Sequence, residues 1–381
     1  MKWEKVKFGD LAICIQPGPF GSQLHSSDYA DEGTPIIMPK DMIDGKISQK
    51  DLIRVPDKHL QRLKRHQVFD GDLMVARKGD VRKCVYITKN ENGWLTGSDC
   101  LKVSLDKEKC FPKYIYYQLR SPFMGRWLET ISIGATMPSL NTGLLSGIEI
   151  FLPTIEEQKR IAGILSAYDS LIENNQEQIK LLEEAAQRLY KEWFVDLRFP
   201  GHENVKIVDG VPEGWENASV TDLLEIRYGK DHKGLADGCI PVYGSGGIMR
   251  KVDKILYSGE SVLIPRKGSL NNILLVSGDF WTIDTMFYSV PKRPNVAKYV
   301  YLYLTGIDMY AMNIGAAVPS MTVKILDGMR LLCPSDSILE LFETTAKPYY
   351  EMIELLKKKQ SMLGETRDRL LPKLMSGEIE V

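Results

Sequence analysis

Two matching basic turns carry side chains suited to binding chemistry. "ARKGD" (Ala76–Asp80) returns as "PRKGS" (Pro265–Ser269) at an offset of 189, and each follows an apolar run that predicts a β-strand. A guanidinium can donate two hydrogen bonds to a guanine edge, and an ammonium group pairs with phosphate. The neighbouring glycine lets the backbone approach a ligand closely. The candidate nucleic-acid contacts are therefore Arg77, Lys78, Arg266 and Lys267, although an ordinary charged surface turn has the same composition.

A second short sequence also occurs twice. "IGATMPSL" (Ile133–Leu140) returns as "IGAAVPSM" (Ile314–Met321), at an offset of 181. Its hydroxyl groups, on Thr136, Ser139 and Ser320, could meet phosphate or base edges. Because the segment is almost unchanged, we expect a role that both copies share, either as a structural turn or as a phosphate contact.

Two further loops differ between the copies and are candidate DNA contacts. The first places small polar residues around an aromatic ring, at Gly18, Phe20, Gly21, Ser22 and Gln23. The second is basic and aromatic, at Lys230, His232, Lys233, Tyr243 and Ser245. Exposed polar and aromatic groups of this kind can contact base edges. The alternatives are a packed turn in the first loop and a plain surface histidine at His232.

The sequence contains none of the short motifs that would place catalysis in this chain. It has no G-x-x-x-x-G-K-[ST], no HExxH and no Asn/Asp-Pro-Pro-aromatic tetrapeptide. "GSGG" (Gly244–Gly247) fails as a dinucleotide fingerprint because Met249 stands in the third glycine's place, and "DKEK" (Asp106–Lys109) is more simply a solvated turn. The six cysteines form no CxxC pair, which indicates buried thiols. We therefore expect neither catalytic nor metal-ligating residues.

Composition indicates a soluble globular chain. Its 381 residues, 44% hydrophobic and 26% charged, favour two domains of ordinary size. No apolar run reaches the ~18 residues that a membrane span needs, and the N-terminal residues lack the pattern of a signal peptide. The formal net charge of −1 neither favours nor excludes a nucleic-acid partner, because a local basic surface can be balanced elsewhere.

The repetition covers most of the chain. "WEKVKFGDL" (Trp3–Leu11) matches "WENASVTDL" (Trp215–Leu223) at an offset of 212, and "PKYIYYQL" (Pro112–Leu119) matches "AKYVYLYL" (Ala297–Leu304) at 185. The order of the matches is kept while the offset changes, so the copies share a skeleton and differ in their loops. Each copy is expected to combine short strands with one Tyr-rich helix, which gives an α/β (α+β) fold.

Each copy is followed by an apolar heptad pattern that predicts a long helix. In the first, "TIEEQ" supplies an N-cap and an acidic first turn, and "DLRFPG" (Asp196–Gly201) ends the helix. The pattern recurs at an offset of 181, where Pro348 is expected to kink or delay the second helix near its start. The seam positions are Ile161, Leu165, Tyr168, Ile172, Asn175, Ile179, Leu182, Ala186, Leu189 and Trp193, then Phe342, Ala346, Tyr349, Ile353, Leu356, Gln360, Leu363, Arg367, Leu370 and Leu374.

Two helices with heptad seams of this length are expected to be partners. A helix of about 40 residues is about 60 Å long, and two in one chain most simply pack antiparallel around a pseudo-twofold axis, with a globular domain near each end. The alternative is that each helix packs only on its own domain.

The residues of the first long helix resemble a known family. "LPTIEEQKRIAGILSAYDSLIENNQEQIKLLEEAAQRLYKEWF" is similar to the central conserved helix of type I restriction-modification specificity (S) subunits. "QPGPFGSQL" (Gln16–Leu24) and "GKDHKGLADGCIPVYGSGGI" (Gly229–Ile248) resemble loops of that family's target recognition domains, and "RDRLLPKLMSGEIEV" resembles its C-terminal tail. The resemblance covers essentially the whole chain and is most specific in the two proline-led helices.

The resemblance implies a non-catalytic reader of double-stranded DNA with a bipartite site. It implies recognition domains at 1–152 and 200–333 (core from about 213), and spacer helices at 153–199 and 334–381. The helices would set the spacer and dock two methyltransferase (M) subunits, which carry S-adenosylmethionine and methylate adenine N6. Two restriction/motor (R) subunits would use ATP and Mg, and this chain would hold no cofactor of its own. The expected location is the cytoplasm of a prokaryote, at the nucleoid, with no membrane contact.

Two other classes of function remain open from the sequence. The first is a coiled-coil adaptor that binds proteins through two globular ends. The second is a fused enzyme with an unrecognised active site, which methylation or cleavage by the purified chain alone would reveal.

Overall fold

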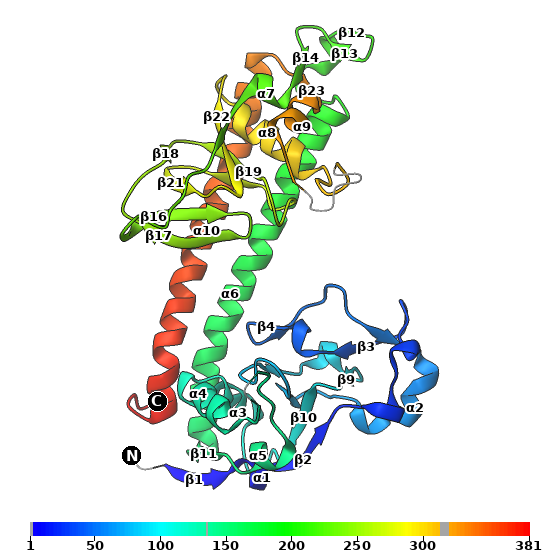
Figure 1. The fold of residues 1–381 in the computed structure, drawn as a ribbon, viewed down its shortest axis with the longest axis vertical. Coiled ribbons are helices and arrows are strands. Elements are labelled where there is room, and N and C mark those ends of the chain that lie inside the picture. Colours follow the sequence, from blue (N-terminus) through cyan, green and yellow to red (C-terminus); the bar gives the residue numbers. More distant parts are fainter. Residues whose placement is uncertain (1–2, 135, 313–319) are drawn as a thin grey trace. The chain divides into compact units, whose positions relative to one another are not determined.

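The computed structural model (Figure 1) describes residues 3–134, 136–312 and 320–381. The chain forms two compact units: Met1–Asn174 with Lys359–Val381, called unit 1, and Asn175–Lys358, called unit 2. Each unit contains part of two long helices, α6 (Ile155–Tyr190) and α10 (Asp336–Ser376). Among the described residues, no helix is long and apolar enough to cross a membrane. The expected mixture of helices and strands is confirmed.

Unit 1 is built around antiparallel strands. The largest sheet has the order β2-β10-β7-β8, and a second sheet, β6-β3-β9, contains a parallel pair, β3 with β9. Strand β1 pairs with β11, and β4 pairs with β5 in a hairpin. The strands are β1 (Glu4–Lys7), β2 (Ala12–Pro17), β3 (Thr34–Ile37), β4 (Met42–Ile43), β5 (Lys46–Ile47), β6 (Arg54–Val55), β7 (Leu73–Ala76), β8 (Cys84–Tyr86), β9 (Leu95–Thr96), β10 (Cys100–Leu105) and β11 (Glu149–Leu152).

Short helices contribute buried side chains to the cores of unit 1. The Tyr-rich run forms helix α3, as predicted, and buries Tyr114 and Tyr117 completely. The α-helices are α1 (Phe8–Leu11), α2 (Leu60–Leu63), α3 (Pro112–Leu119), α4 (Pro122–Ile131) and α5 (Thr142–Ser146). The 3-10 turns are η1 (Gly21–Gln23), η2 (Ser26–Asp28), η3 (Pro39–Asp41), η4 (Asp57–His59), η5 (Lys64–His66) and η6 (Lys89–Glu91).

Unit 2 has a closely related set of sheets. Its antiparallel sheet has the order β15-β22-β19-β20, and the sheet β17-β16-β21-β18 contains the parallel pair β16 with β21. Strand β14 pairs with β23, and β12 pairs with β13. The strands are β12 (Ile207–Val208), β13 (Val211–Pro212), β14 (Glu216–Ser219), β15 (Leu224–Tyr228), β16 (Asp237–Gly244), β17 (Gly247–Val252), β18 (Tyr257–Ser258), β19 (Ser261–Pro265), β20 (Leu274–Val276), β21 (Asp279–Thr282), β22 (Met286–Pro291) and β23 (Arg330–Cys333).

The second Tyr-rich run also forms a helix, α8, as predicted. Its buried Tyr299 packs against Phe194, with 4.7 Å between ring centroids. The remaining helices of unit 2 are α7 (Val220–Leu223), α8 (Val296–Thr305), α9 (Val323–Gly328), the π-turn η7 (Lys191–Val195) and the 3-10 turn η8 (His202–Asn204).

The two units share one topology. In each, a strand near the start pairs with the last strand, as β1 does with β11 and β14 does with β23. Each also has a four-stranded antiparallel sheet in which the strands follow the same order. The units differ most in the sheet that holds the parallel pair, which has three strands in unit 1 and four in unit 2. This supports the interpretation of a duplicated skeleton with altered loops.

Helix α6 begins with the predicted cap. The Thr154 hydroxyl accepts from the Glu157 backbone N–H at 3.3 Å, and the Glu157 carboxylate accepts from the Thr154 backbone N–H at 3.0 Å. This reciprocal arrangement satisfies two backbone donors that a helix start otherwise leaves unpaired. The sequence after Pro153 therefore fixes where the long helix starts.

Within unit 1, the start of α6 packs against the end of α10. Ile161 and Leu165 share a core with Leu374. The Asp169 carboxylate accepts from Arg367 Nη1 at 2.7 Å and from the Tyr117 hydroxyl at 2.6 Å. One carboxylate on α6 thus joins α10 to α3. Burial of the Tyr117 hydroxyl, together with its hydrogen bond to Asp169, raises the pKa of Tyr117.

Within unit 2, the end of α6 and the π-turn η7 that follows it pack against the start of α10. The Trp193 and Phe342 rings lie 5.7 Å apart, centroid to centroid, and Ala186 and Ala346 are buried in the same core. Inside each unit, the start of one long helix therefore shares a core with the end of the other.

The predicted seam residues are buried or half-buried at every position. Asn175, the polar position in the first seam, is 2% exposed. Of the two effects expected of Pro348, a kink or a delayed start, the delayed start is wrong, because α10 starts at Asp336 and continues through Pro348. Proline removes one backbone donor, and the long flanking helix compensates for that loss.

Candidate nucleic-acid interface

The basic turn of unit 1 is the loop between β7 and β8. The loop closes through the Ala76 N–H, which donates to the Lys83 carbonyl at 2.9 Å. Gly79 has a φ of +79°, a conformation that favours glycine. Arg77 is half-buried and Lys78 is exposed, with Lys78 Nζ 3.3 Å from Asp99 Oδ1. The strand-end position predicted for these cations is confirmed.

Arg77 lies over an exposed aromatic ring. Its guanidinium carbon is 5.7 Å from the centroid of Phe20, which is 56% exposed. Gly18, two residues before Phe20, packs closely against the chain at Gly97, where a Cβ would fall 1.9 Å from the Gly97 carbonyl oxygen. The predicted loop residue Phe20 is thus brought together with the predicted Arg77. Contact with the ring restricts the guanidinium, and Arg77 is only half-buried, so part of its side chain stays accessible.

The remaining residues of this loop form the turn η1. Gly21 has a φ of +60°, Ser22 follows it, and Gln23 is half-buried. The Gln23 carbonyl accepts a hydrogen bond from Arg62 Nη1. Gln23 therefore supports the loop through its backbone, while Phe20 exposes its side chain.

Buried His66 supports the strand that leads into this loop. Its Nδ1 lies 3.1 Å from Gln16 Nε2, and Arg65 Nε donates to its Nε2 at 3.1 Å, so Nε2 must be unprotonated. Burial, and then the charge of Arg65, lowers the pKa of His66 from 6.5 to about 4. The imidazole is thus neutral in the folded protein at neutral pH.

The neutral state of His66 makes the stability of the chain depend on pH. Below about pH 6.5 the His66 side chain of the unfolded chain binds a proton, whereas that of the folded chain stays neutral down to about pH 4. The free energy of unfolding therefore falls between these two pH values, by at most about 3 kcal/mol. We expect His66→Gln to lose less stability between pH 7.5 and pH 5 than the wild type in thermal unfolding. An identical pH dependence in both proteins would contradict this assignment.

The repeated segment is hydrogen-bonded to the basic turn. Ile133 and Ser139 exchange two backbone hydrogen bonds of 2.9 Å, and the Leu140 N–H donates to the Arg77 carbonyl at 2.8 Å. Thr136 is exposed within the small loop that Ile133 and Ser139 close. Of the two roles considered, these bonds support a structural turn, and the Thr136 hydroxyl remains accessible for a contact.

The same connection occurs in unit 2. The Met321 N–H donates to the Arg266 carbonyl at 2.9 Å, and Lys267 pairs with Ser320 in an isolated β-bridge, as Lys78 does with Ser139. The rest of the second copy, residues 313–319, lies outside the described residues. The repeat is therefore explained by a shared connection between this segment and the basic turn.

Arg266 also lies over an exposed aromatic ring, which the sequence analysis missed. Its guanidinium carbon is 5.4 Å from the centroid of Tyr228, which is 55% exposed. Gly229 has the role of Gly18, since a Cβ there would fall 2.0 Å from the Ile283 carbonyl oxygen. In unit 1 the ring follows the close-packed glycine by two positions, and in unit 2 it precedes it by one. Because of this change of spacing, the sequence alone does not show that Tyr228 corresponds to Phe20.

The structure separates the other predicted residues of unit 2. Ser245 lies against the basic turn, because a Cβ on Gly268 would come 2.7 Å from its Oγ. Tyr243 is half-buried in β16, where its ring meets Phe280 at 6.2 Å and burial raises its pKa. Lys230 and Lys233 are exposed, on either side of the half-buried His232. Tyr243 therefore supports the sheet, and the more exposed residues around it are the better candidates for contact with a ligand.

The described residues contain no cluster of three or more His, Cys, Asp or Glu side chains that could hold a metal ion. What the units do contain is one arrangement, present twice: a strand-end arginine on an exposed aromatic ring, followed by an exposed lysine and a glycine. Such an arrangement can donate hydrogen bonds to a base edge and hold a phosphate.

Comparisons with known proteins give a consistent result. Residues 1–184 match the family described as "Type I restriction modification DNA specificity domain". The chain is 28% identical over 329 residues to the type I restriction enzyme MjaIX specificity subunit of Methanocaldococcus jannaschii, covering 78% of this chain and 75% of the relative. It is 23% identical to the putative MjaX specificity subunit of the same organism over 100% of this chain and 94% of that one.

A solved structure shares the fold. The crystal structure of the type I restriction-modification system S subunit from M. genitalium has a TM-score of 0.62 to this chain, with 19% sequence identity. The match covers 98% of this chain and 96% of that one, so the fold is shared over almost the whole length of both.

Proposed function

This chain belongs to the family of type I restriction-modification specificity subunits, which recognise DNA sequence, and we propose that each of its two units reads one half of a bipartite site. The observation that carries the proposal is the stacked arginine in each unit, Arg77 on Phe20 and Arg266 on Tyr228. A guanidinium held in this way is suited to bidentate contact with guanine, and the adjacent lysines are suited to phosphate.

We propose recognition domains at residues 1–152 and 200–333, with spacer helices at 153–199 and 334–381. Strand pairing supports these limits, since β1 pairs with β11, which ends at Leu152, and β14 pairs with β23, which ends at Cys333. Each pairing closes one domain immediately before a long helix. The two helices would form an antiparallel pair, related by a pseudo-twofold axis, that sets the spacing between the half-sites.

Exchange of one recognition domain tests whether each domain reads its own half of the site. Replacing residues 1–152 with the first recognition domain of another specificity subunit should change one half of the recognised sequence and keep the other half and the spacer. A change in both halves, or in neither, would contradict the proposal. An adaptor that binds proteins through its ends would show no such half-by-half change.

We propose further that the helices dock two methyltransferase subunits, which carry S-adenosylmethionine, and that two restriction/motor subunits complete the complex. Exposed apolar residues support two equivalent docking surfaces. Leu171 and Leu181 on α6 are 46% and 53% exposed, and Met352 and Met362, at the matching repeat positions on α10, are 44% and 69% exposed. Apolar side chains exposed at matching positions of a repeat fit two copies of one partner. This chain itself would be non-catalytic.

A charge at one of these positions should prevent the docking of one partner. We expect Leu181→Glu or Met362→Glu to reduce the complex from two methyltransferase subunits to one, and the double variant to leave none, measured as complex mass in solution. Gln176→Glu adds the same charge at an exposed polar position and should keep both subunits. Retention of both subunits by the double variant would exclude this surface.

A further inference from the structure

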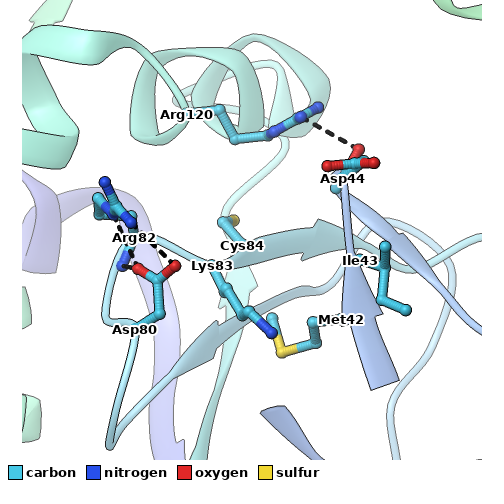
Figure 2. Close-up of a pocket in the computed structure, with 9 residues that line it drawn as sticks. Met42, Ile43, Asp44, Asp80, Arg82, Lys83, Cys84 and Arg120 are labelled. Atoms are coloured by element: carbon cyan, nitrogen blue, oxygen red, sulfur yellow. Dashed lines mark hydrogen bonds and ion pairs between the residues drawn. The ribbon is translucent and has the colours of Figure 1, made fainter. Parts of the chain in front are cut away.

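A cavity of about 280 Å³ lies beside the basic turn of unit 1. Figure 2 shows its charged lining: Arg82, Lys83 and Arg120, with the carboxylates of Asp44 and Asp80. Met42, Ile43, Gly45 and Cys84 complete the lining. Arg82 and Lys83 belong to the same β7–β8 loop as Arg77 and Lys78, so the cavity adjoins the candidate DNA contacts.

Two of the three cations have only uncharged partners. Lys83 Nζ donates to the Pro39 carbonyl at 2.9 Å, and Arg120 donates to the Tyr116 hydroxyl at 2.6 Å and to the Asp44 carbonyl at 3.1 Å. Neither forms an ion pair with any residue that the structure describes. An ammonium group has three donors, so Lys83 retains capacity for an anion.

Arg82 differs from these two cations because carboxylates bind it. Its Nε lies 2.8 Å from Asp80 Oδ1 and 3.3 Å from Glu129 Oε1. Asp80 is thereby occupied by Arg82, and the Arg82 side-chain hydrogen bond holds the pKa of Asp80 below its usual range. The positive charge available to a ligand therefore comes mainly from Lys83 and Arg120.

The surroundings hold Arg120 in place. The turn between β4 and β5 packs so closely on it that a Cβ on Gly45 would fall 2.3 Å from Arg120 Nη1. Gly45 has a φ of +82°, which favours glycine here as well. Burial raises the pKa of Cys84 to about 12, so this thiol stays neutral. A fixed guanidinium loses little side-chain entropy when it binds an anion.

Unit 2 provides an internal comparison. The repeat aligns Asn271 and Asn272 with Arg82 and Lys83, and Thr305 with Arg120. Asn272 Nδ2 donates to the Ser245 carbonyl at 2.8 Å, and Asn271 Nδ2 donates to Asp308 Oδ1 at 3.0 Å. Unit 2 therefore adopts the same fold with neutral side chains at these positions. The fold alone does not require the cations that unit 1 has there.

We propose that this cavity of unit 1 binds one backbone phosphate of the DNA. The inference rests on the proposed function, because it assumes that unit 1 contacts DNA through the adjacent basic turn. Lys83 and Arg120 are the cations of this lining that no carboxylate of the described residues pairs with, so they can meet the single negative charge of a phosphodiester. Phosphate contacts of this kind supply affinity and position without reading sequence. The aligned part of unit 2 lacks the site.

Neutralisation of Lys83 tests the proposal. Lys83→Gln keeps a donor for the Pro39 carbonyl and removes the charge. For the complex of the full chain with its methyltransferase subunits, we expect several-fold weaker binding to every DNA sequence, and a salt dependence of log K that is shallower by about 0.9. Lys83→Arg should retain wild-type behaviour, and Lys206→Gln makes the same charge change in the exposed β12–β13 region and should have no effect.

A substitution that should strengthen DNA binding distinguishes an effect on binding from an effect on folding. Asp44 lines the cavity, and its carboxylate would repel a phosphate, so Asp44→Asn should strengthen DNA binding by several-fold. A loss of fold cannot produce that result. Unchanged or weaker binding by Asp44→Asn would count against the proposal.

Replacement of single phosphates by uncharged methylphosphonates identifies the ligand. One position in the half-site read by unit 1 should weaken wild-type binding when neutralised and have no further effect in Lys83→Gln. If no position is coupled to Lys83 while inorganic phosphate alone stabilises the wild type and not the variant, the cavity holds a free anion and the proposal is wrong. If Lys83→Gln binds DNA sequence-specifically with an unchanged salt slope, this inference alone is overturned. If the wild-type complex shows no sequence-specific binding at all, the proposed function is overturned as well.

Discussion

Arg77→Ala and Arg266→Ala should each abolish recognition at one base pair of one half-site and leave the other half-site intact. A bidentate contact between arginine and guanine contributes about 1–3 kcal/mol of discrimination, which is about a 5- to 150-fold preference. Arg77 belongs to unit 1 and Arg266 to unit 2, and each is oriented by an exposed ring within its own unit. The two substitutions should therefore affect different halves of the site.

The measurement is binding of each variant, in complex with its methyltransferase subunits, to DNA duplexes that carry every single-base change in the target. Lys78→Ala and Lys267→Ala are the matched controls, because the loss of a phosphate contact weakens all sequences alike and reduces the salt slope. Phe20→Leu and Tyr228→Leu should partly reproduce the arginine variants, since they remove the ring under each guanidinium. Equal effects of Arg77→Ala on both half-sites would contradict the assignment.

Insertion of one heptad into each long helix should lengthen the recognised spacer. Seven residues add about 10.5 Å to a helix, and B-DNA rises about 3.4 Å per base pair, so the increase should be up to about 3 base pairs. The insertions belong after Asn174 in α6 and after Lys358 in α10, where one unit ends and the other begins. Placed there, they leave the internal contacts of each unit unchanged.

The control for this change is a seven-residue insertion at Asp209–Gly210, the exposed turn between β12 and β13. It lies outside both helices and should leave the spacer unaltered. Mapping the methylated sites of both proteins gives the two spacers directly. If the helix insertion preserves the original spacer while methylation continues, the helices do not set the distance between the half-sites.

The basic turns could be predicted from the sequence because their chemistry is local. An apolar run that ends at Arg-Lys-Gly defines a strand end, and the structure places Arg77 and Arg266 there. Tyr228 could not be predicted in the same way. Its role depends on how closely Gly229 approaches the chain at Ile283, and no pattern within one strand reveals that contact.

The cavity of unit 1 was also beyond the sequence analysis. Lys83 and Arg120 are far apart in the sequence and come together only because α3 packs beside the β7–β8 loop. Helix α10 shows the opposite limitation. Its heptad pattern correctly predicted a long helix. Pro348 led to the expectation of a kink or a delayed start, and the helix starts without delay at Asp336, because tertiary packing along the rest of the helix outweighs one missing hydrogen bond.

The most direct test of the central claim is a map of methylated adenines in the genome of a host that carries the partner methyltransferase, with and without this gene. We predict that one bipartite methylation motif, with two half-sites and a fixed spacer, is present with the gene and absent without it. An active methyltransferase that produces the same map in both strains would contradict the claim that this chain selects the DNA site.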